Sequence, residues 1–149
     1  MDLYQELILE HSKRPHGAGL REPYAGEAHH VNPTCGDEIT LRVAVDGDTL
    51  RDISYDSLGC SISVASASIL AALLTGEDIA SAQTTYRAMK EMLTSKGADP
   101  GDEEVIGDGV ALAGVSKYPA RVKCALLSWM ALSDALAQNG IDLQGETNR

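Results

Sequence analysis

The feature that most constrains the fold is an alternating apolar stretch that is interrupted by a tight-turn signal. Apolar side chains occupy every second position from 39 to 45, and the alternation resumes after Leu50 at Ile53 and Tyr55. Asp46-Gly47 lies between the two runs, and this dipeptide suits the positive backbone angles of a short hairpin turn. Period-two patterning puts one face of each strand against a core. The stretch therefore predicts a β-hairpin with one buried face.

Helical periodicity flanks the hairpin on both sides. A first amphipathic helix is expected over residues 3–12, and others over residues 61–74, over residues 79–93 and from Pro119 to about residue 138. Residues 27–32 are expected to add a third, weakly patterned strand. The order predicts an α+β fold, in which a small antiparallel sheet of about three strands packs against several helices. We expect residues 1–149 to form a single domain.

The segment from 97 to 118 is rich in glycine and acidic residues, and it shows no regular apolar period. We expect a mobile, solvated loop region there. Its carboxylates lack the order of a calcium-binding loop. The four histidines are expected on the surface, in loops or in strands.

Charge and hydropathy narrow the classes of partner. The 149-residue chain has 12 basic and 22 acidic side chains and a net charge of −10. It has no basic run that could follow a phosphate backbone, so nucleic acid is not an expected partner. No stretch of eighteen apolar residues occurs, and the first residues lack the pattern of a signal peptide. We therefore expect no membrane association and a cytoplasmic location.

The three cysteines are too few, and odd in number, for a disulfide framework. Cys35 and Asp37 lie two residues apart, so an extended backbone would direct both side chains to the same side. Cys60 follows a predicted strand and begins a helix, whose dipole favours a thiolate. Cys124 lies in the last helix, away from its apolar stripe, and is not an obvious core residue. These spacings match no zinc-finger or ferredoxin pattern, and free cysteine is also a common core residue.

The donor set nevertheless suits a metal. Three thiolates and one carboxylate fill the four positions of a tetrahedral zinc ion. The carboxylate of Asp37 is the harder and weaker donor, which favours a site that exchanges ligands.

Three motifs carry a resemblance to a known family. Asn-Pro-Thr-Cys35-Gly-Asp37, Gly59-Cys60-Ser61 and the segment from Tyr118 to Cys124 resemble those of the IscU/SufU family of iron-sulfur cluster assembly proteins. The chain is more similar to the SufU branch than to the IscU scaffolds. Lys123 stands where the scaffolds carry a histidine, and the interval from Cys60 to Cys124 is longer by roughly twenty residues, enough for a short helix and a loop.

The resemblance implies a zinc-dependent sulfurtransferase. It would accept persulfide sulfur from a SufS-type, PLP-containing cysteine desulfurase and pass it to downstream SUF assembly proteins. One zinc per chain would be held by Cys35, Asp37, Cys60 and Cys124. Cys35 would be the sulfur acceptor, freed from zinc when a histidine of the desulfurase replaces it. Arg121 would act at the desulfurase interface, or else be an ordinary surface residue.

Three alternatives remain open on sequence alone. The same cysteines could bind iron and build an iron-sulfur cluster on a scaffold. A zinc-stabilised protein could stimulate the desulfurase without carrying sulfur. A cysteine-histidine hydrolase would need a histidine as base, but the sequence does not place any histidine beside a particular cysteine; the candidates are His11, His16, His29 and His30.

Overall fold

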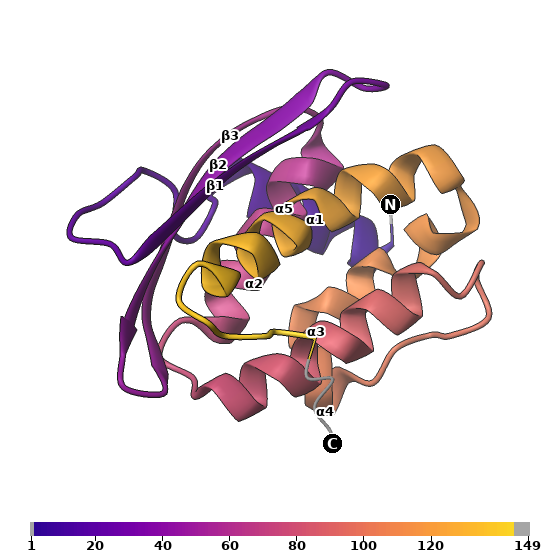
Figure 1. Ribbon diagram of the computed structural model, residues 1–149. Helices are drawn as coiled ribbons and strands as arrows, with labels where there is room; N and C mark the ends of the chain where they lie inside the picture. Colours follow the sequence, from indigo (N-terminus) through magenta and orange to yellow (C-terminus); the bar gives the residue numbers. More distant parts are fainter. Residues whose placement is uncertain (1, 145–149) are drawn as a thin grey trace.

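The computed structural model describes residues 2–144, in which a sheet lies along one side of the molecule and helices cover its inner face (Figure 1). In chain order the elements are α1 (Leu3–Lys13), β1 (Gly26–Asn32), β2 (Asp37–Asp46), β3 (Thr49–Leu58), α2 (Ser61–Leu74), α3 (Ile79–Leu93), α4 (Glu103–Ile106), the 3-10 helix η1 (Gly107–Lys117) and α5 (Pro119–Ala137).

The three strands form an antiparallel sheet in the order β1-β2-β3. The predicted hairpin is β2 and β3, and Gly47 at its turn has a φ of 65°. Such a positive φ strains any side chain with a Cβ, which explains a glycine at this position. The predicted third strand is β1, which pairs with β2 from Gly26 opposite Val43 to Asn32 opposite Asp37. The expected α+β fold is confirmed.

The inner face of the sheet supplies one side of the core. Leu41 and Val43 of β2 are fully buried, as the alternation predicts. Helix α5 packs on β1 and β2, and α2 packs on α5. A polar link fixes the two helices together: Trp129 Nε1 donates to Ser66 Oγ at 3.0 Å, and that hydroxyl donates to the Ala125 carbonyl at 2.6 Å. This link holds α2 and α5, the two helices nearest the cysteines, at a fixed spacing.

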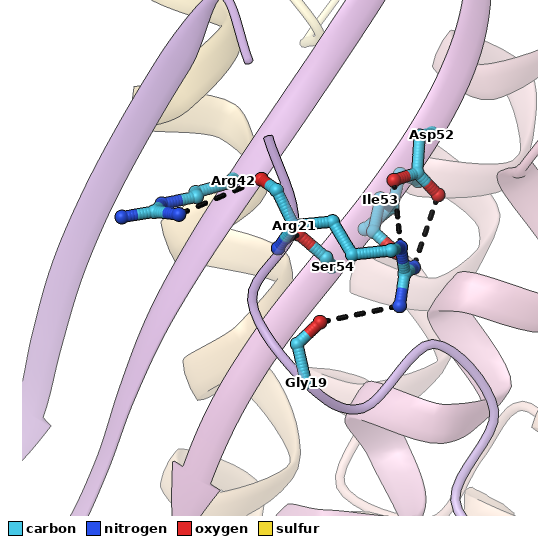
Figure 2. A network of polar contacts seen from close by, with 6 residues as sticks. All are labelled: Gly19, Arg21, Arg42, Asp52, Ile53 and Ser54. Carbon is cyan, nitrogen blue, oxygen red and sulfur yellow. Dashed lines mark hydrogen bonds and ion pairs between the residues drawn. The ribbon is translucent and has the colours of Figure 1, made fainter. Parts of the chain in front are cut away.

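The outer face of the sheet is partly covered by the segment between α1 and β1 (Figure 2). Arg21 makes two hydrogen bonds to the Asp52 carboxylate, at 2.9 and 3.0 Å, and its backbone N–H donates to Ser54 Oγ at 3.1 Å. Arg42 Nη1 also reaches the Arg21 carbonyl at 3.5 Å. The hydrogen bonds from Arg21 hold the pKa of Asp52 below its usual range. These contacts fasten the connecting segment to β2 and β3.

The segment from 97 to 118 differs from the expected loop. It forms α4 and η1, and Ile106 and Leu112 are completely buried. The prediction was wrong because these apolar residues are spaced irregularly, so no helical period reveals them, yet they pack against α1, α3 and α5. Most of its acidic side chains face solvent, as predicted, although Asp99 is half-buried; the exposed ones are Asp102, Glu103, Glu104 and Asp108.

His11 also differs from expectation, because it is buried and not on the surface. Its ring lies between Ser68 Oγ, 2.7 Å from Nδ1, and the Asp108 carboxylate, 2.9 Å from Nε2. Two hydrogen bonds offset the cost of burying a polar ring. The residue thus connects α1 to α2 and η1. None of the helices within residues 2–144 is long and apolar enough to cross a membrane.

Candidate metal centre

The chemistry-bearing residues come from three separate parts of the fold. Cys35 lies in the turn between β1 and β2, and Asp37 is the first residue of β2. Cys60 is the N-cap of α2, directly after β3, and Cys124 lies in the second turn of α5. The turn is closed by the Gly36 N–H, which donates to the Asn32 carbonyl at 2.8 Å. Gly36 has a φ of 77°, which a residue with a side chain rarely adopts.

Asp37 is fully buried, and the start of α2 holds its carboxylate. The backbone N–H of Cys60 donates to Asp37 Oδ1 at 2.9 Å, and Cys60 Sγ lies 3.9 Å from Oδ2. This hydrogen bond uses one oxygen and leaves the other toward the sulfur. Gly59 permits the close approach, because a Cβ at that position would collide with the carboxylate. The carboxylate therefore joins the hairpin to α2.

Cys124 is buried, with 3% of its surface exposed. Its exposure was misjudged from the sequence because α5 is buried on more than one face: Leu127 and Ala131, on the same side of the helix, are buried as well. The sulfur points to the turn between β1 and β2, with Cys35 Sγ at 3.4 Å and the Asn32 side-chain nitrogen at 3.8 Å. Burial raises the pKa of the Cys124 thiol well above its usual range. A metal cation would offset this cost of forming a thiolate.

The geometry suits a tetrahedral metal ion. Ligand atoms of Cys35, Asp37 and Cys124 all lie within 4.8 Å of one another. Zinc with Zn–S bonds of about 2.3 Å needs sulfur atoms about 3.8 Å apart, close to the separation of the Cys35 and Cys124 sulfurs. Cys60 is not part of this group of three, but its sulfur lies 3.9 Å from Asp37 Oδ2. The donor set of sulfur with one oxygen fits zinc. The structure brings three of the four predicted residues within ligand distance of one another, and Cys60 lies next to Asp37.

Arg121 lies at the exposed start of α5, with its guanidinium 5.0 Å from the ring centre of Tyr118. Both residues line a pocket of about 400 Å³ between α1, η1 and α5. Tyr118 is 52% exposed. Arg121 is therefore an exposed cation in the first turn of α5, next to an exposed aromatic residue, and it is not one of the candidate ligands.

The sequence did not indicate a role for two further residues of the centre, Asn32 and Gly59. Asn32 is 6% exposed and directs its amide at a sulfur, and Gly59 gives space to a carboxylate. Both lie inside the motifs quoted above, so their closeness in sequence to Cys35 and Cys60 could have marked them as part of the site. Their contacts span 92 and 22 residues of sequence, respectively, and no local pattern reveals such contacts.

The histidines do not support a cysteine-histidine pair. The His29 ring contacts Thr40 at 2.8 Å and Glu38 at 3.3 Å, and the His30 ring contacts Asp134 at 2.6 Å. His16 packs against His11, with ring centres 5.4 Å apart. Within residues 2–144, no histidine ring hydrogen-bonds a cysteine.

Comparison with known proteins agrees with this arrangement. The sequence pattern of the NifU-like N terminal domain matches residues 3–125, which include all four candidate ligands. The chain belongs to this family. The resemblance to IscU and SufU proteins is thereby confirmed.

Relatives of this NifU-like chain have two different names. It is 42% identical over 137 residues to the zinc-dependent sulfurtransferase SufU of Bacillus subtilis, an alignment that covers 91% of this chain and 90% of the relative. It is 38% identical to the iron-sulfur cluster assembly scaffold protein IscU of Streptococcus pyogenes, over 92% of this chain and 84% of the relative.

A solved structure supports the same family. The putative scaffold protein for the SUF system from Fervidobacterium islandicum superposes on this NifU-like chain with a TM-score of 0.77 and 33% identity. The match covers 88% of this chain and 94% of that one.

Proposed function

We propose that this protein is a zinc-dependent sulfurtransferase in iron-sulfur cluster assembly, which accepts persulfide sulfur from a SufS-type, PLP-containing cysteine desulfurase. The observation that carries the proposal is the arrangement of the centre: Cys35 is an exposed residue, and its sulfur lies within 4.8 Å of ligand atoms of the buried Asp37 and Cys124. A site that only stabilised the fold would have no need to present a thiol to solvent. The 42% identity to SufU supports the same reaction.

In this proposal Cys35, Asp37, Cys60 and Cys124 are the ligands of one zinc ion. Zinc supplies a positive charge that keeps thiols deprotonated at neutral pH. Asp37 is held by the Cys60 N–H, and the Cys124 sulfur of α5 faces the turn between β1 and β2. Cys35 is the exposed member on that turn, outside any strand or helix, so we expect it to be the ligand that leaves the centre. A histidine of the desulfurase would take its place.

The sulfur step is a thiolate exchange. The Cys35 thiolate attacks the outer sulfur of the desulfurase persulfide. A new S–S bond forms to Cys35 Sγ, the S–S bond of the donor breaks, and its electron pair leaves with the donor cysteine as a thiolate. The proton on the outer sulfur stays with that sulfur. Downstream SUF assembly proteins would then receive it, in the cytoplasm, where thiols remain reduced.

A scaffold role is the second candidate, because one relative, at 38% identity, is named as a scaffold. Thiolates that bind zinc also bind iron, and the same residues could hold a cluster. The two functions differ in what the protein carries after purification without added iron. A sulfurtransferase contains zinc and gains a persulfide, whereas a scaffold gains iron and sulfide together.

The test combines metal analysis with persulfide mapping. The protein is incubated with a cysteine desulfurase and cysteine, and peptide mass spectrometry then locates the added sulfur. We expect about one zinc per chain and a mass gain of one sulfur atom on Cys35. Cys35→Ser should abolish the gain and also the stimulation of the desulfurase. Stimulation that persists in Cys35→Ser would instead identify an activator that does not carry sulfur.

A further inference from the structure

The structure gives the three sulfurs of the centre different surroundings. Cys35 and Cys60 are exposed, whereas Cys124 is buried. The buried sulfur has a nitrogen donor beside it: the side-chain amide of Asn32, itself 6% exposed, lies 3.8 Å from Cys124 Sγ. Asn32 has no role in the function proposed above.

Asn32 is held firmly in place by the backbone around it. It is the last residue of β1 and pairs with Asp37 across the sheet. Its carbonyl accepts the Gly36 N–H at 2.8 Å, which closes the turn that carries Cys35. The amide is thus fixed to the same turn as two of the candidate ligands, while it contacts a third on α5. Opposite a thiolate, the NH₂ end of the amide is the end that interacts favourably.

An N–H donor changes the chemistry of a thiolate. It withdraws electron density from the sulfur, so the sulfur is a weaker nucleophile, and it fixes the sulfur's position. Cys60 is anchored differently, through its backbone N–H to Asp37. Within the described residues, the hydrogen-bond partner of the Cys35 thiol is the sulfur of Cys124. The Cys124 sulfur, in contrast, also lies 3.6 Å from the Ala120 carbonyl and 3.8 Å from the Asn32 amide. Cys124 is therefore more restrained than Cys35.

We propose that Asn32 is a positioning residue that selects which cysteine accepts sulfur. Its amide retains Cys124 at the centre and lowers the reactivity of that sulfur, so Cys35 is the thiolate that leaves and attacks. This inference rests on the proposed function, because it concerns the same sulfur transfer. Without the amide, the same thiolate exchange would also occur at Cys124, with the same bonds made and broken.

The experiment uses zinc-loaded protein and cysteine persulfide as a small-molecule donor, without a desulfurase. Asn32→Leu removes the donor and keeps a similar side-chain size, and Asn32→Asp replaces the donor with a carboxylate. Asn139→Leu is the matched control, since its exposed amide donates to the Ala25 carbonyl, which lies at the opposite end of β1 from Asn32. Peptide mass spectrometry measures the share of added sulfur on each cysteine.

We expect wild type and Asn139→Leu to carry the sulfur on Cys35. In both Asn32 variants the share on Cys124 should rise about tenfold relative to Cys35, the order expected for losing a hydrogen bond to a charged group. If Asn32→Leu does not fold, as judged by circular dichroism, Asn32→Asp carries the test because its side chain has the shape of asparagine.

Cobalt(II) provides a second measurement that an effect on folding alone would not move. With Co²⁺ in place of zinc, the thiolate-to-metal charge-transfer band should shift to lower energy in the Asn32 variants, because the sulfur regains electron density. An unchanged band together with unchanged sulfur placement in a folded Asn32 variant would overturn the role of Asn32. Sulfur on Cys60, or on no cysteine, in wild type would instead contradict Cys35 as the acceptor. The two failures are therefore distinguishable.

Discussion

At the scale of single residues, the centre depends on a carboxylate with two tasks. Asp37 accepts the Cys60 N–H with one oxygen, and its other oxygen faces the Cys60 sulfur. Because the residue is fully buried, the hydrogen bond from Cys60 and the proposed zinc would together offset the cost of burying a carboxylate. This explains why a harder oxygen donor occurs among three sulfurs: it fastens the hairpin to α2 as well as offering a ligand.

Asp37→Ala should remove both contributions, and Asp37→Asn should keep an acceptor for the Cys60 N–H. We expect partial loss of zinc in both variants and a fall in the sulfur transfer rate of at least about tenfold. Asp37→Ala should lose about 1–2 kcal/mol more unfolding free energy than Asp37→Asn, because only the alanine leaves the Cys60 N–H unpaired. Metal content, transfer rate and denaturant unfolding are measured on one preparation. Full zinc with an undiminished rate would show that Asp37 is not a working ligand.

Arg121 provides a test of partner binding that is separate from metal binding. Its exposed guanidinium beside Tyr118 could meet a carboxylate or carbonyl of the desulfurase. Arg121→Ala should keep zinc but raise the concentration for half-maximal stimulation of the desulfurase by about tenfold. Arg87→Ala, an exposed arginine on α3, is the control and should change neither quantity. If Arg121→Ala leaves the concentration for half-maximal stimulation unchanged, Arg121 is an ordinary surface residue.

At the scale of elements, the centre is a junction of the turn between β1 and β2, the N-terminus of α2 and the interior of α5. β1 and β2 bring Cys35 and Asp37 to one end of the sheet, and β3 delivers Cys60 to the start of α2 beside them. Helix α5 completes the centre because Ser66 and Trp129 fix it to α2. The spacing between β2 and the start of α2 is set by Gly59, where no side chain fits.

Gly59→Ala tests this junction. The added Cβ would displace the Asp37 carboxylate, so the variant should lose about 1–3 kcal/mol of unfolding free energy and bind zinc more weakly. Gly114→Ala is the matched control, because a Cβ at Gly114 meets no heavy atom within 4 Å. Chemical denaturation and competition with a chromophoric chelator measure the two effects. Equal behaviour of both variants would mean that α2 can shift away from β2 without disturbing the centre.

At the scale of the whole molecule, the proposed zinc would connect parts of the chain that are otherwise far apart in sequence. Cys35 and Cys124 are 89 residues apart, and their sulfurs adjoin at 3.4 Å. A ligand that binds the folded state and not the unfolded chain stabilises the fold by mass action. The centre should therefore contribute to the stability of the sheet and of α5 together.

Removal of zinc by a chelator should lower the melting temperature by about 5 °C or more, since each kcal/mol corresponds to several degrees in a chain of this size. Differential scanning calorimetry with and without chelator measures this change. A variant with all three cysteines replaced by serine should not respond to the chelator. A wild-type melting curve that the chelator leaves unchanged would contradict a zinc ion that bridges these elements.

The sequence by itself determined the local structure of most elements and the donor types available at the site. The extended backbone expected over residues 35–37 was wrong, because Cys35 and Gly36 lie in a turn and Gly36 has a φ of 77°. Period-two alternation specified the β2–β3 hairpin, and helical spacing placed α1, α2, α3 and α5. These inferences succeeded because each depends on residues a few positions apart, where backbone geometry alone fixes the directions of side chains.

Only the tertiary structure decided the burial of Asp37, His11 and Cys124, the helical form of residues 103–117, and the contact of Asn32 with a sulfur on α5. Each of these results from packing between segments that are distant in sequence. Irregularly spaced side chains such as Ile106 and Leu112 are ordered by the surfaces they cover, and a polar group is buried where a distant partner pairs with it. A local pattern contains no information about either partner.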